Sequence, residues 1–369
     1  MSVTLLGLEL HRLRMPLVAP FRTSFGVETA RDVLLVRALT AAADGWGECV
    51  AGAEPLYSVE YVDSAQEVIR RFLFPRLAAT AQLTAAEVST VLASVRGHLM
   101  AKAAVELAIL DAELRTAGVR LVHHLGGVRE RVPAGVSVGI ADSIPELLDA
   151  VAGYLAAGYL RIKLKIQPGW DVEPVAAVRR AHADVPLQVD ANAAYARSDA
   201  DQLARLDEFG LLLIEQPLPE DDLVGHAELA RRLRTPICLD ESINSARAAE
   251  TAIALGACSI VNIKAGRVGG YLEARRVHDL CAAAGVPVWC GGMLETGIGR
   301  AANVALAALP NFSMPGDTSA SERYFSRDVT APFVLREGHL DVPAGPGIGV
   351  EPDGSVLREL SSSMELLRV

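Results

Sequence analysis

The sequence predicts an α/β protein in which a (β/α)8-type, TIM-like barrel carries an α+β capping domain. From about residue 132, eight short β-branched runs alternate with helical patterns, and each unit takes roughly 25 residues. The first third differs, because its strands come first and its helices follow. A chain of 369 residues is long enough for a barrel of about 250 residues and a second unit.

The first third contains the elements of the capping domain. Residues 3–15 and 33–38 have the β-branched or alternating pattern of strands. The segment 20–26 (PFRTSFG) between them is predicted to be a turn-rich loop, and residues 45–49 end a further strand. Helical spacing of apolar residues is clearest over 100–117, which is rich in Ala, Leu and Glu.

Three parts are expected along the chain: residues 1–130 in the capping domain, 131–320 in the barrel, and a Gly- and Pro-rich tail, 321–369, that returns to the capping domain. A doubly wound open sheet is the rival architecture, but it would usually have fewer strands, and no GxGxxG follows the first barrel run. The eight strand-like runs are 132–140, 160–166, 186–192, 211–217, 236–242, 259–266, 287–293 and 311–317.

The composition argues against several classes of protein. Lys and Arg total 35 against 45 Asp and Glu, and the net charge of −10 disfavours a nucleic-acid binder or a polybasic membrane-surface protein. The longest stretch without a charged residue, 301–316, is shorter than the roughly 18 residues of a membrane span. The five cysteines form no CxxC pair, and the N-terminal segment does not resemble a signal peptide. Together these features indicate a protein of the reducing cytoplasm.

Charged side chains close five successive barrel runs. They are Lys165, Asp190, Glu215, Asp240 and Lys264, spaced 25, 25, 25 and 24 residues apart. Any one of these acids would pass as a helix N-cap. Five strand ends at one spacing instead indicate a common rim, where barrel enzymes keep their active sites.

The three carboxylates of this rim predict a metal site. Like charges on adjacent strands repel unless a cation lies between them. Oxygen donors from Asp190, Glu215 and Asp240 favour a hard ion, Mg²⁺ or Mn²⁺. The absence of His and Cys at these strand ends disfavours zinc.

The lysines flank the three carboxylates, so Lys165 and Lys264 are expected to reach opposite faces of a ligand held there. A lysine acts as a base near neutral pH only if its pKa is lowered. Lys163 shares the strand parity of Lys165, and Arg267 follows Lys264 by three residues. Repulsion between these cations is expected to lower a lysine pKa on each side.

The same motifs carry a family resemblance that covers essentially the whole chain. KLK (163–165), DAN (190–192), IEQP (214–217), LDES (239–242) and NIK (262–264) resemble the enolase superfamily, in its muconate-lactonising-enzyme-like subgroup. Longer segments resemble the N-acylamino acid racemase and o-succinylbenzoate synthase group, among them PLVAPFRTSFG (16–26), GWGECV (45–50) and VNIKAGRVGGYLEARR (261–276).

The resemblance implies roles for individual residues. Asp190, Glu215 and Asp240 would bind Mg²⁺, Lys165 would be the base on one face of the substrate with Lys163 tuning it, and Lys264 would be the base on the other face. The resemblance also implies support or substrate contact by Asn192, Glu241, Ser137, Gly291, Met293 and Asp317, and closure over the substrate by Phe21, Phe25 and Tyr57. Arg267 is expected to support Lys264 because of its spacing from that lysine.

The implied activity is Mg²⁺-dependent removal of a proton α to a carboxylate, in a bifunctional N-succinylamino acid racemase and o-succinylbenzoate synthase of the menaquinone pathway. The pairing of a Lys base with Mg²⁺ is a general feature of enolase-superfamily sites. A homo-oligomer, dimer or octamer, is also implied. Dipeptide epimerase stays open, because Asp317 would suit a substrate ammonium group. Muconate cycloisomerase and a non-catalytic metal-binding barrel stay open as well.

Overall fold

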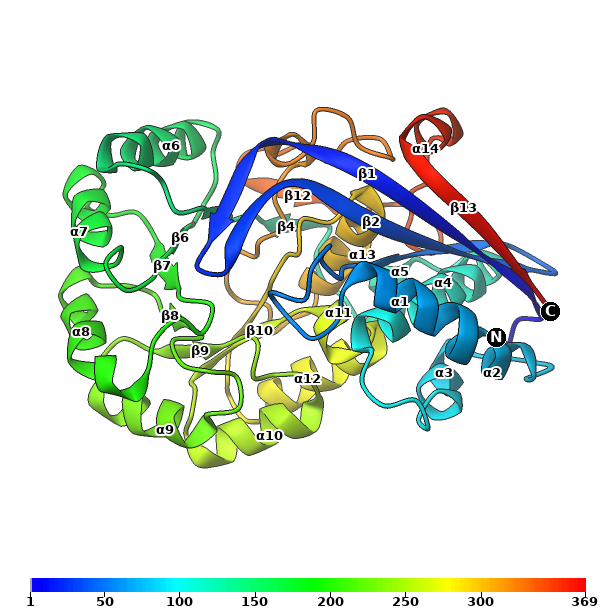
Figure 1. The fold of residues 1–369 in the computed structure, drawn as a ribbon, viewed down its shortest axis with the longest axis horizontal. Coiled ribbons are helices and arrows are strands. Elements are labelled where there is room, and N and C mark those ends of the chain that lie inside the picture. Colours follow the sequence, from blue (N-terminus) through cyan, green and yellow to red (C-terminus); the bar gives the residue numbers. More distant parts are fainter. Residues whose placement is uncertain (1) are drawn as a thin grey trace.

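The computed structural model describes residues 2–369 and confirms the predicted barrel with a separate capping sheet (Figure 1). Seven parallel strands lie in the order β11-β10-β9-β8-β7-β6-β5, so sequence neighbours are also neighbours in space. Every residue of these strands is buried, as expected when helices cover the outside of a parallel sheet. The strands are β5 (Val136–Val138), β6 (Ile162–Lys165), β7 (Leu187–Asp190), β8 (Ile214–Glu215), β9 (Ile237–Leu239), β10 (Ile260–Ile263) and β11 (Val288–Cys290).

The eighth run, 311–317, closes the barrel without forming a regular strand, so the prediction of eight regular strands was wrong in this detail. Isolated parallel bridges join Phe312 to Val288 and Gly316 to Ala134. Pro310 and Pro315 lack an N–H, which limits the ladder hydrogen bonds that this segment can make.

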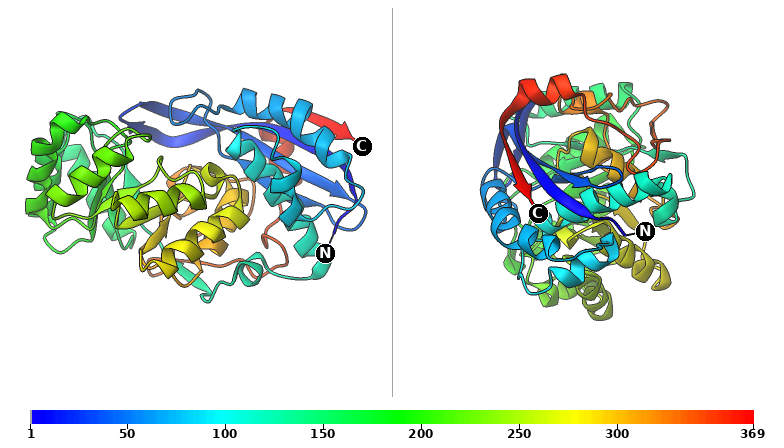
Figure 2. Two further views of the ribbon diagram at one scale, coloured as in Figure 1. Left: turned by 90° about the horizontal axis from the view of Figure 1, so that it is seen from below. Right: turned by 90° about the vertical axis from the view of Figure 1, so that its right-hand side faces the viewer.

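Helices follow the strands around the barrel and cover its outside (Figure 2). Side-chain oxygens of Ser143, Asp222 and Ser245 accept backbone N–H bonds at the first turns of three of them, which fixes where these helices begin. The barrel helices are α6 (Ile144–Ala156), α7 (Val172–Ala181), α8 (Ala200–Ala204), α9 (Leu223–Arg232), α10 (Ala246–Leu255), α11 (Ala265–Val268), α12 (Tyr271–Ala283) and α13 (Gly297–Ala307), with short turns η2 (Arg197–Asp199) and η3 (Arg205–Phe209).

The capping sheet is antiparallel, in the order β13-β1-β2-β3. The last strand, β13 (Ser361–Arg368), pairs with β1 (Leu5–Thr23), so the C-terminal tail joins the N-terminal sheet and both chain ends lie at one end of the molecule (Figure 1). The sheet is completed by β2 (Gly26–Thr40) and β3 (Gly45–Cys49).

Strands β1 and β2 form one long hairpin, which corrects the predicted loop over 20–26. Phe21 pairs with Glu28 and Thr23 with Gly26, so only residues 24 and 25 form the turn. A register shift between Pro16 and Phe21 interrupts the pairing and allows Pro20, which has no N–H to donate, to lie within β1. The hairpin therefore extends over the barrel, toward β6 and β7 in Figure 1.

Helix α4 (Leu99–Ala117) matches the predicted helix over 100–117 and packs on β3. Within residues 2–369 no helix has both the length and the apolar character needed to cross a bilayer. The remaining elements are α1 (Val62–Val68), η1 (Ile69–Leu73), α2 (Phe74–Ala78), α3 (Ala85–Val91), α5 (Leu121–Leu125), β4 (Arg131–Pro133), η4 (Ser321–Arg323), β12 (His339–Asp341) and α14 (Gly354–Leu360).

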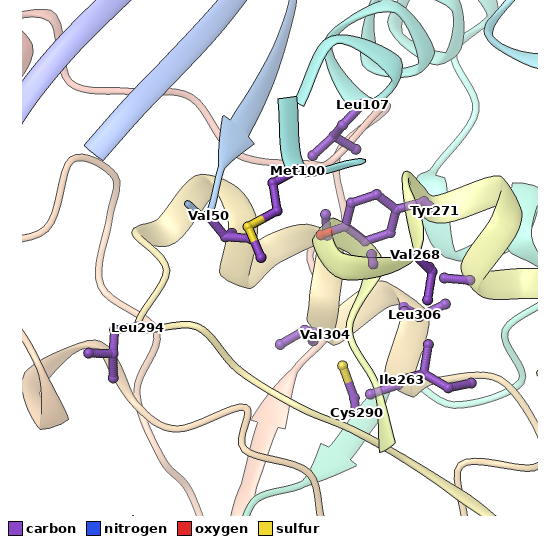
Figure 3. Close-up of a cluster of buried hydrophobic side chains, with 14 of the residues drawn as sticks. Val50, Met100, Leu107, Ile263, Val268, Tyr271, Cys290, Leu294, Val304 and Leu306 are labelled. Atoms are coloured by element: carbon purple, nitrogen blue, oxygen red, sulfur yellow. The ribbon is translucent and has the colours of Figure 1, made fainter. Parts of the chain in front are cut away.

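Apolar and charged contacts join the capping domain to the barrel. Val50, Met100 and Leu107 from the capping side lie in one buried cluster with Ile263, Val268, Tyr271, Cys290 and Leu306 from the barrel (Figure 3). The buried carboxylate of Glu48 on β3 accepts hydrogen bonds from Thr296 N at 3.0 Å and Gly299 N at 2.9 Å, at the start of α13. The hairpin is thus held over the barrel from a fixed base.

Candidate active site

The three predicted metal ligands lie at one rim of the barrel. Parallel register pairs Lys165 with Asp190 and Asp190 with Glu215, while Asp240 directly follows β9. All three carboxylates are 0% exposed. Equivalent positions on successive parallel strands face the same end of the barrel, which is why the spacing of about 25 residues brings them together.

Two lysines of β6 lie against one side of this group. Lys165 Nζ is 2.6 Å from Asp190 Oδ2 and 2.6 Å from Asn192 Oδ1. Lys163 lies deeper, with Nζ 3.0 Å from Glu215 Oε2, 3.1 Å from Asp190 Oδ2 and 2.7 Å from Asp317 Oδ2. The two ammonium groups therefore share the Asp190 carboxylate.

Lys264 lies on the other side. Its Nζ is 2.8 Å from Asp240 Oδ2 and 3.0 Å from the Tyr57 hydroxyl, and it lies 4.5 Å from the centre of the Tyr57 ring. Arg267 Nη1 donates to Asp240 Oδ1, while its other nitrogens bond the backbone carbonyls of Ile243 and Asn262 at 2.8 and 2.7 Å. Lys165 and Lys264 thus contact opposite members of the carboxylate group.

These contacts set the direction of the pKa shifts. Burial opposes ionisation of Asp190, but Lys165 and Lys163 outweigh it and hold the pKa of this carboxyl well below its ordinary value. Burial opposes the charge of Lys163 as well, yet Asp317, Glu215 and Asp190 raise its pKa. The predicted lowering of a lysine pKa is therefore not seen at Lys163. The predicted lowering of a pKa on the other side is not seen at Lys264, because Tyr57 and nearby carboxylates outweigh burial and raise its pKa.

The residues of the rim fit a divalent cation by donor type and burial. A lysine or Arg267 lies against each rim carboxylate. Among residues 2–369, no three carboxylate, imidazole or thiol groups converge as a metal cluster. The donors are carboxylate oxygens on three neighbouring strands, which suits a hard ion such as Mg²⁺. The buried oxygens Glu241 Oε2 and Asn262 Oδ1 also lack hydrogen-bond partners beside this group.

Two polar side chains beyond the strand ends shape the rim through strained backbone. Asn192, with φ of 43°, links Lys165 to Glu241 through its amide, whose Nδ2 is 2.9 Å from Glu241 Oε1. Burial and the nearby Asp190 charge raise the pKa of Glu241 to about 7. Gln216, with φ of 37°, is buried and accepts from Asp240 N and Ser242 N at 3.0 and 3.2 Å. Such non-glycine conformations persist only where the surroundings hold them.

A cavity of about 690 Å³ opens above the lysines, between the hairpin and the barrel. The predicted residues that line it are Phe21, Phe25, Tyr57, Ser137, Lys163, Lys165, Asn192, Lys264, Met293 and Asp317. Six other predicted residues do not belong to this lining within the described chain: the three metal ligands Asp190, Glu215 and Asp240, together with Glu241, Arg267 and Gly291. Gly291 instead packs behind Lys264, where a Cβ would come within 2.8 Å of Lys264 Cε.

The hairpin tip is docked on the barrel around this cavity. Ser24 Oγ donates to Ala191 O at 3.3 Å, Ile140 N donates to Arg22 O at 2.9 Å, and Arg22 forms an ion pair with Asp142. The Phe25 and Tyr57 rings lie 6.1 Å apart above the lysines. These contacts hold apolar side chains over the charged rim.

Sequence reasoning missed three buried polar residues of the site: Gln216, Asn262 and Arg161. Asn262 Nδ2 donates to Glu215 Oε1 at 2.6 Å, and Arg161 Nη2 lies 2.9 Å from Asp317 Oδ1. Both precede a predicted lysine by two residues, so strand parity already directed them into the barrel. Gln216 directly follows Glu215, but it carries no charge, so the pattern of charged strand ends did not include it.

Family models match both parts of the chain. Residues 8–126 match the model described as the mandelate racemase / muconate lactonizing enzyme N-terminal domain, and residues 146–356 match the enolase C-terminal domain-like model. An N-succinylamino acid racemase from an Amycolatopsis species is 66% identical and the alignment covers 97% of each chain. An o-succinylbenzoate synthase from Geobacillus kaustophilus is 49% identical over 96% of this chain and 95% of its own.

Solved structures share the fold over the full length. A member of the enolase superfamily from Listeria innocua matches with a TM-score of 0.95 at 40% identity, covering 99% of both chains. A dipeptide epimerase from Cytophaga hutchinsonii, complexed with Mg and a dipeptide, matches with a TM-score of 0.90 at 25% identity, covering 100% of both chains.

Proposed function

Because the chain belongs to the enolase superfamily, in its muconate-lactonising-enzyme-like subgroup, we propose that it is a divalent-metal-dependent enzyme with two activities, N-succinylamino acid racemase and o-succinylbenzoate synthase. The relatives that support the proposal carry these two names at 66% and 49% identity over nearly the whole chain. Both reactions begin with removal of a proton from the carbon next to a carboxylate.

One observation carries the proposal: two lysines contact opposite members of the rim. Lys165 bonds Asp190 from β6 and Lys264 bonds Asp240 from the end of β10. A substrate α-carbon held between them has one lysine on each face. When one lysine takes the proton and the other returns a proton to the opposite face, the configuration inverts.

Asp190, Glu215 and Asp240 would hold the metal ion, and Mg²⁺ is the ion we propose. When bound, the ion would stabilise the negative charge that builds up on the substrate carboxylate as the α-proton leaves. Lys163 keeps its proton beside Asp190 and Glu215, and so adds a fixed positive charge close to Lys165.

Dehydration of 2-succinyl-6-hydroxy-2,4-cyclohexadiene-1-carboxylate uses the same groups. One lysine removes the α-proton and then donates it to the leaving hydroxyl, which departs as water, while the second lysine stays cationic beside the substrate. Phe21 and Phe25 line the cavity, and with substrate bound their apolar side chains would reduce the access of bulk water and so strengthen these charge interactions. Ser137 offers a buried hydroxyl without a protein partner to either substrate.

Dipeptide epimerisation and muconate cycloisomerisation are less supported. An epimerase site needs a carboxylate free to accept a substrate ammonium group. Asp317, the carboxylate expected to suit that group, has Arg161 at 2.9 Å and Lys163 at 2.7 Å.

We also propose a cytoplasmic homo-oligomer, and the five free, buried cysteines suit a reducing compartment.

Paired kinetics on one preparation test the proposal. With Mg²⁺ present, kcat/KM is measured for N-succinyl-L-phenylalanine by loss of optical rotation and for the hydroxycyclohexadiene carboxylate by its absorbance. We expect turnover of both, and both lost in Asp240→Asn and Lys165→Ala. Absence of both activities in the metal-loaded wild type would overturn the proposal.

A further inference from the structure

Arg161 is a buried arginine on the floor of the barrel, directly before β6. Its Nε and Nη2 donate to Pro315 O at 3.2 and 2.8 Å, and its guanidinium carbon lies 5.2 Å from the centre of the Trp289 ring. The side chain is 0% exposed. A buried charge of this kind needs a partner of opposite charge.

That partner is Asp317, which faces the cavity from the closing segment of the barrel. Asp317 Oδ1 lies 2.9 Å from Arg161 Nη2, and Oδ2 lies 2.7 Å from Lys163 Nζ. Each oxygen therefore lies within ion-pair distance of its own cation, although Oδ1 accepts no hydrogen bond. The carboxylate is present at the substrate cavity, but its charge is already compensated twice.

We propose that Arg161 is a specificity-determining residue: by pairing with Asp317 it withholds this carboxylate from the substrate, so that the site accepts N-acylated amino acids and rejects substrates with a free ammonium group. The inference rests on the proposed function, because it names which carboxylate-bearing substrates the same site accepts. An ammonium group that leaves water needs an uncompensated anion. At Asp317 it would meet two cations for one carboxylate, whereas an N-acyl amide brings no charge.

Arg161 is the member of this cluster that can be changed selectively. Lys163 also contacts Asp190 and Glu215, so its removal would disturb the proposed metal ligands. Arg161 forms an ion pair with Asp317 alone among residues 2–369. Its guanidinium also donates to the backbone carbonyls of Pro315 and Val136, which carry no net charge.

The test compares two ligands that differ only in the ammonium group, L-Ala-L-Phe and N-acetyl-L-Ala-L-Phe. Their Kd values are measured by calorimetry on the Mg²⁺-loaded full chain, independently of turnover. We expect the wild type to bind the acetylated ligand at least tenfold more tightly. In Arg161→Met this preference should shrink at least tenfold, and in Arg161→Lys, which keeps the charge, it should stay as in the wild type.

The carboxylate itself is tested by adding Asp317→Asn to Arg161→Met, which should remove the gained binding of the free dipeptide. If Arg161→Met does not fold, Arg161→Gln is used, since it keeps a donor for the Pro315 carbonyl. A wild type without preference, or an uncharged variant with wild-type circular dichroism, Mg²⁺ affinity and preference, would overturn the inference. Failure of the proposed function looks different: no turnover of either proposed substrate, whatever the Kd ratio.

Discussion

At the residue scale, every carboxylate of the rim is compensated by a cation of the chain itself. Lys165 lies on Asp190, Lys163 on Glu215, and Arg267 on Asp240. Buried carboxylates tolerate this crowding only when paired and hydrogen-bonded. Neutral side chains also position the rim: Asn262 donates to the Glu215 carboxylate, and Gln216 accepts from the backbone N–H of Asp240.

Gln216→Leu should weaken divalent-metal binding by about 5- to 100-fold, because Asp240 N and Ser242 N would lose their buried acceptor at a cost of about 1–3 kcal/mol. The Kd of Mn²⁺ measured by electron paramagnetic resonance checks this. The control variant is Gln202→Leu. The Gln202 amide donates to Asp171 Oδ1 at 2.8 Å, and this pair lies away from the rim. Equal Mn²⁺ affinity in both variants would show that Gln216 does not position Asp240.

The sequence predicted this rim at the level of charges but not of neutral residues. Regular spacing revealed the acids and lysines, since equivalent strand ends must share one end of a barrel. Asn262 and Gln216 carry no charge and do not recur at a regular interval. Their contacts with Glu215 and Asp240 can therefore be identified only from the structure. The direction of the Lys163 and Lys264 pKa shifts likewise depends on distances that spacing does not supply.

At the element scale, the capping domain depends on close approach between β3 and α4. A Cβ on Gly47 would lie 3.0 Å from Ala108 N, so this strand packs on the helix only with glycine there. The sequence predicted α4 nearly to the residue, because its run of strong helix formers is long. The sequence pattern wrongly predicted a loop over 20–26. A hairpin whose pairing is interrupted near a proline has a sequence similar to that of a loop.

Gly47→Ala should lower the free energy of unfolding by about 1–3 kcal/mol, since the added methyl forces β3 from α4. Gly153 is the matched control, because it lies inside α6 with open space around it. Gly153→Ala should be neutral or raise stability by about 0.5–1 kcal/mol. Urea unfolding followed by circular dichroism separates the two, and equal stability of both variants would contradict the packing account.

The link between β3 and α13 should make stability depend on pH. Burial, only partly offset by bonds from Thr296, raises the pKa of Glu48 from 4.5 to about 7. The folded state then holds the proton more tightly than the unfolded state, so the free energy of unfolding falls as pH rises from about 4.5 to about 7. For this one group the fall amounts to about 3 kcal/mol.

Urea unfolding of the wild type and of Glu48→Gln at several pH values between 5 and 8 checks this dependence. The wild-type curve should fall more steeply than that of the variant, because an amide does not titrate. Glu67→Gln, at a surface carboxylate, should keep the wild-type slope. Parallel curves for the wild type and Glu48→Gln would exclude Glu48 as the source.

At the scale of the whole molecule, neither domain forms the site alone. The barrel supplies the charged rim, while the hairpin and Tyr57 cover it from the capping sheet. The fold class was predictable from the strand and helix patterns, whereas the covering of the site by capping-domain residues was implied only by the family resemblance. The irregular pairing of the closing segment 311–317 was not predicted; Pro315 within it and Pro310 directly before it cannot donate ladder hydrogen bonds.

Removal of divalent ions with EDTA should abolish both activities, and added Mg²⁺ should restore them. The far-UV circular dichroism should stay unchanged, because lysines and Arg267 already compensate the rim carboxylates without an ion. Full activity after exhaustive chelation would contradict the metal assignment. Loss of structure on chelation would contradict the compensation by lysines.

The central claim, that Lys165 and Lys264 act on opposite faces of one α-carbon, is tested most directly by proton exchange in D₂O. The α-proton of N-succinyl-L-phenylalanine and of its D enantiomer is followed by NMR with Lys165→Ala and Lys264→Ala. Each variant should exchange the proton of one enantiomer only, the opposite one in each case, without racemisation. Exchange of both enantiomers by either variant, or racemisation by Lys264→Ala, would contradict the two-base account.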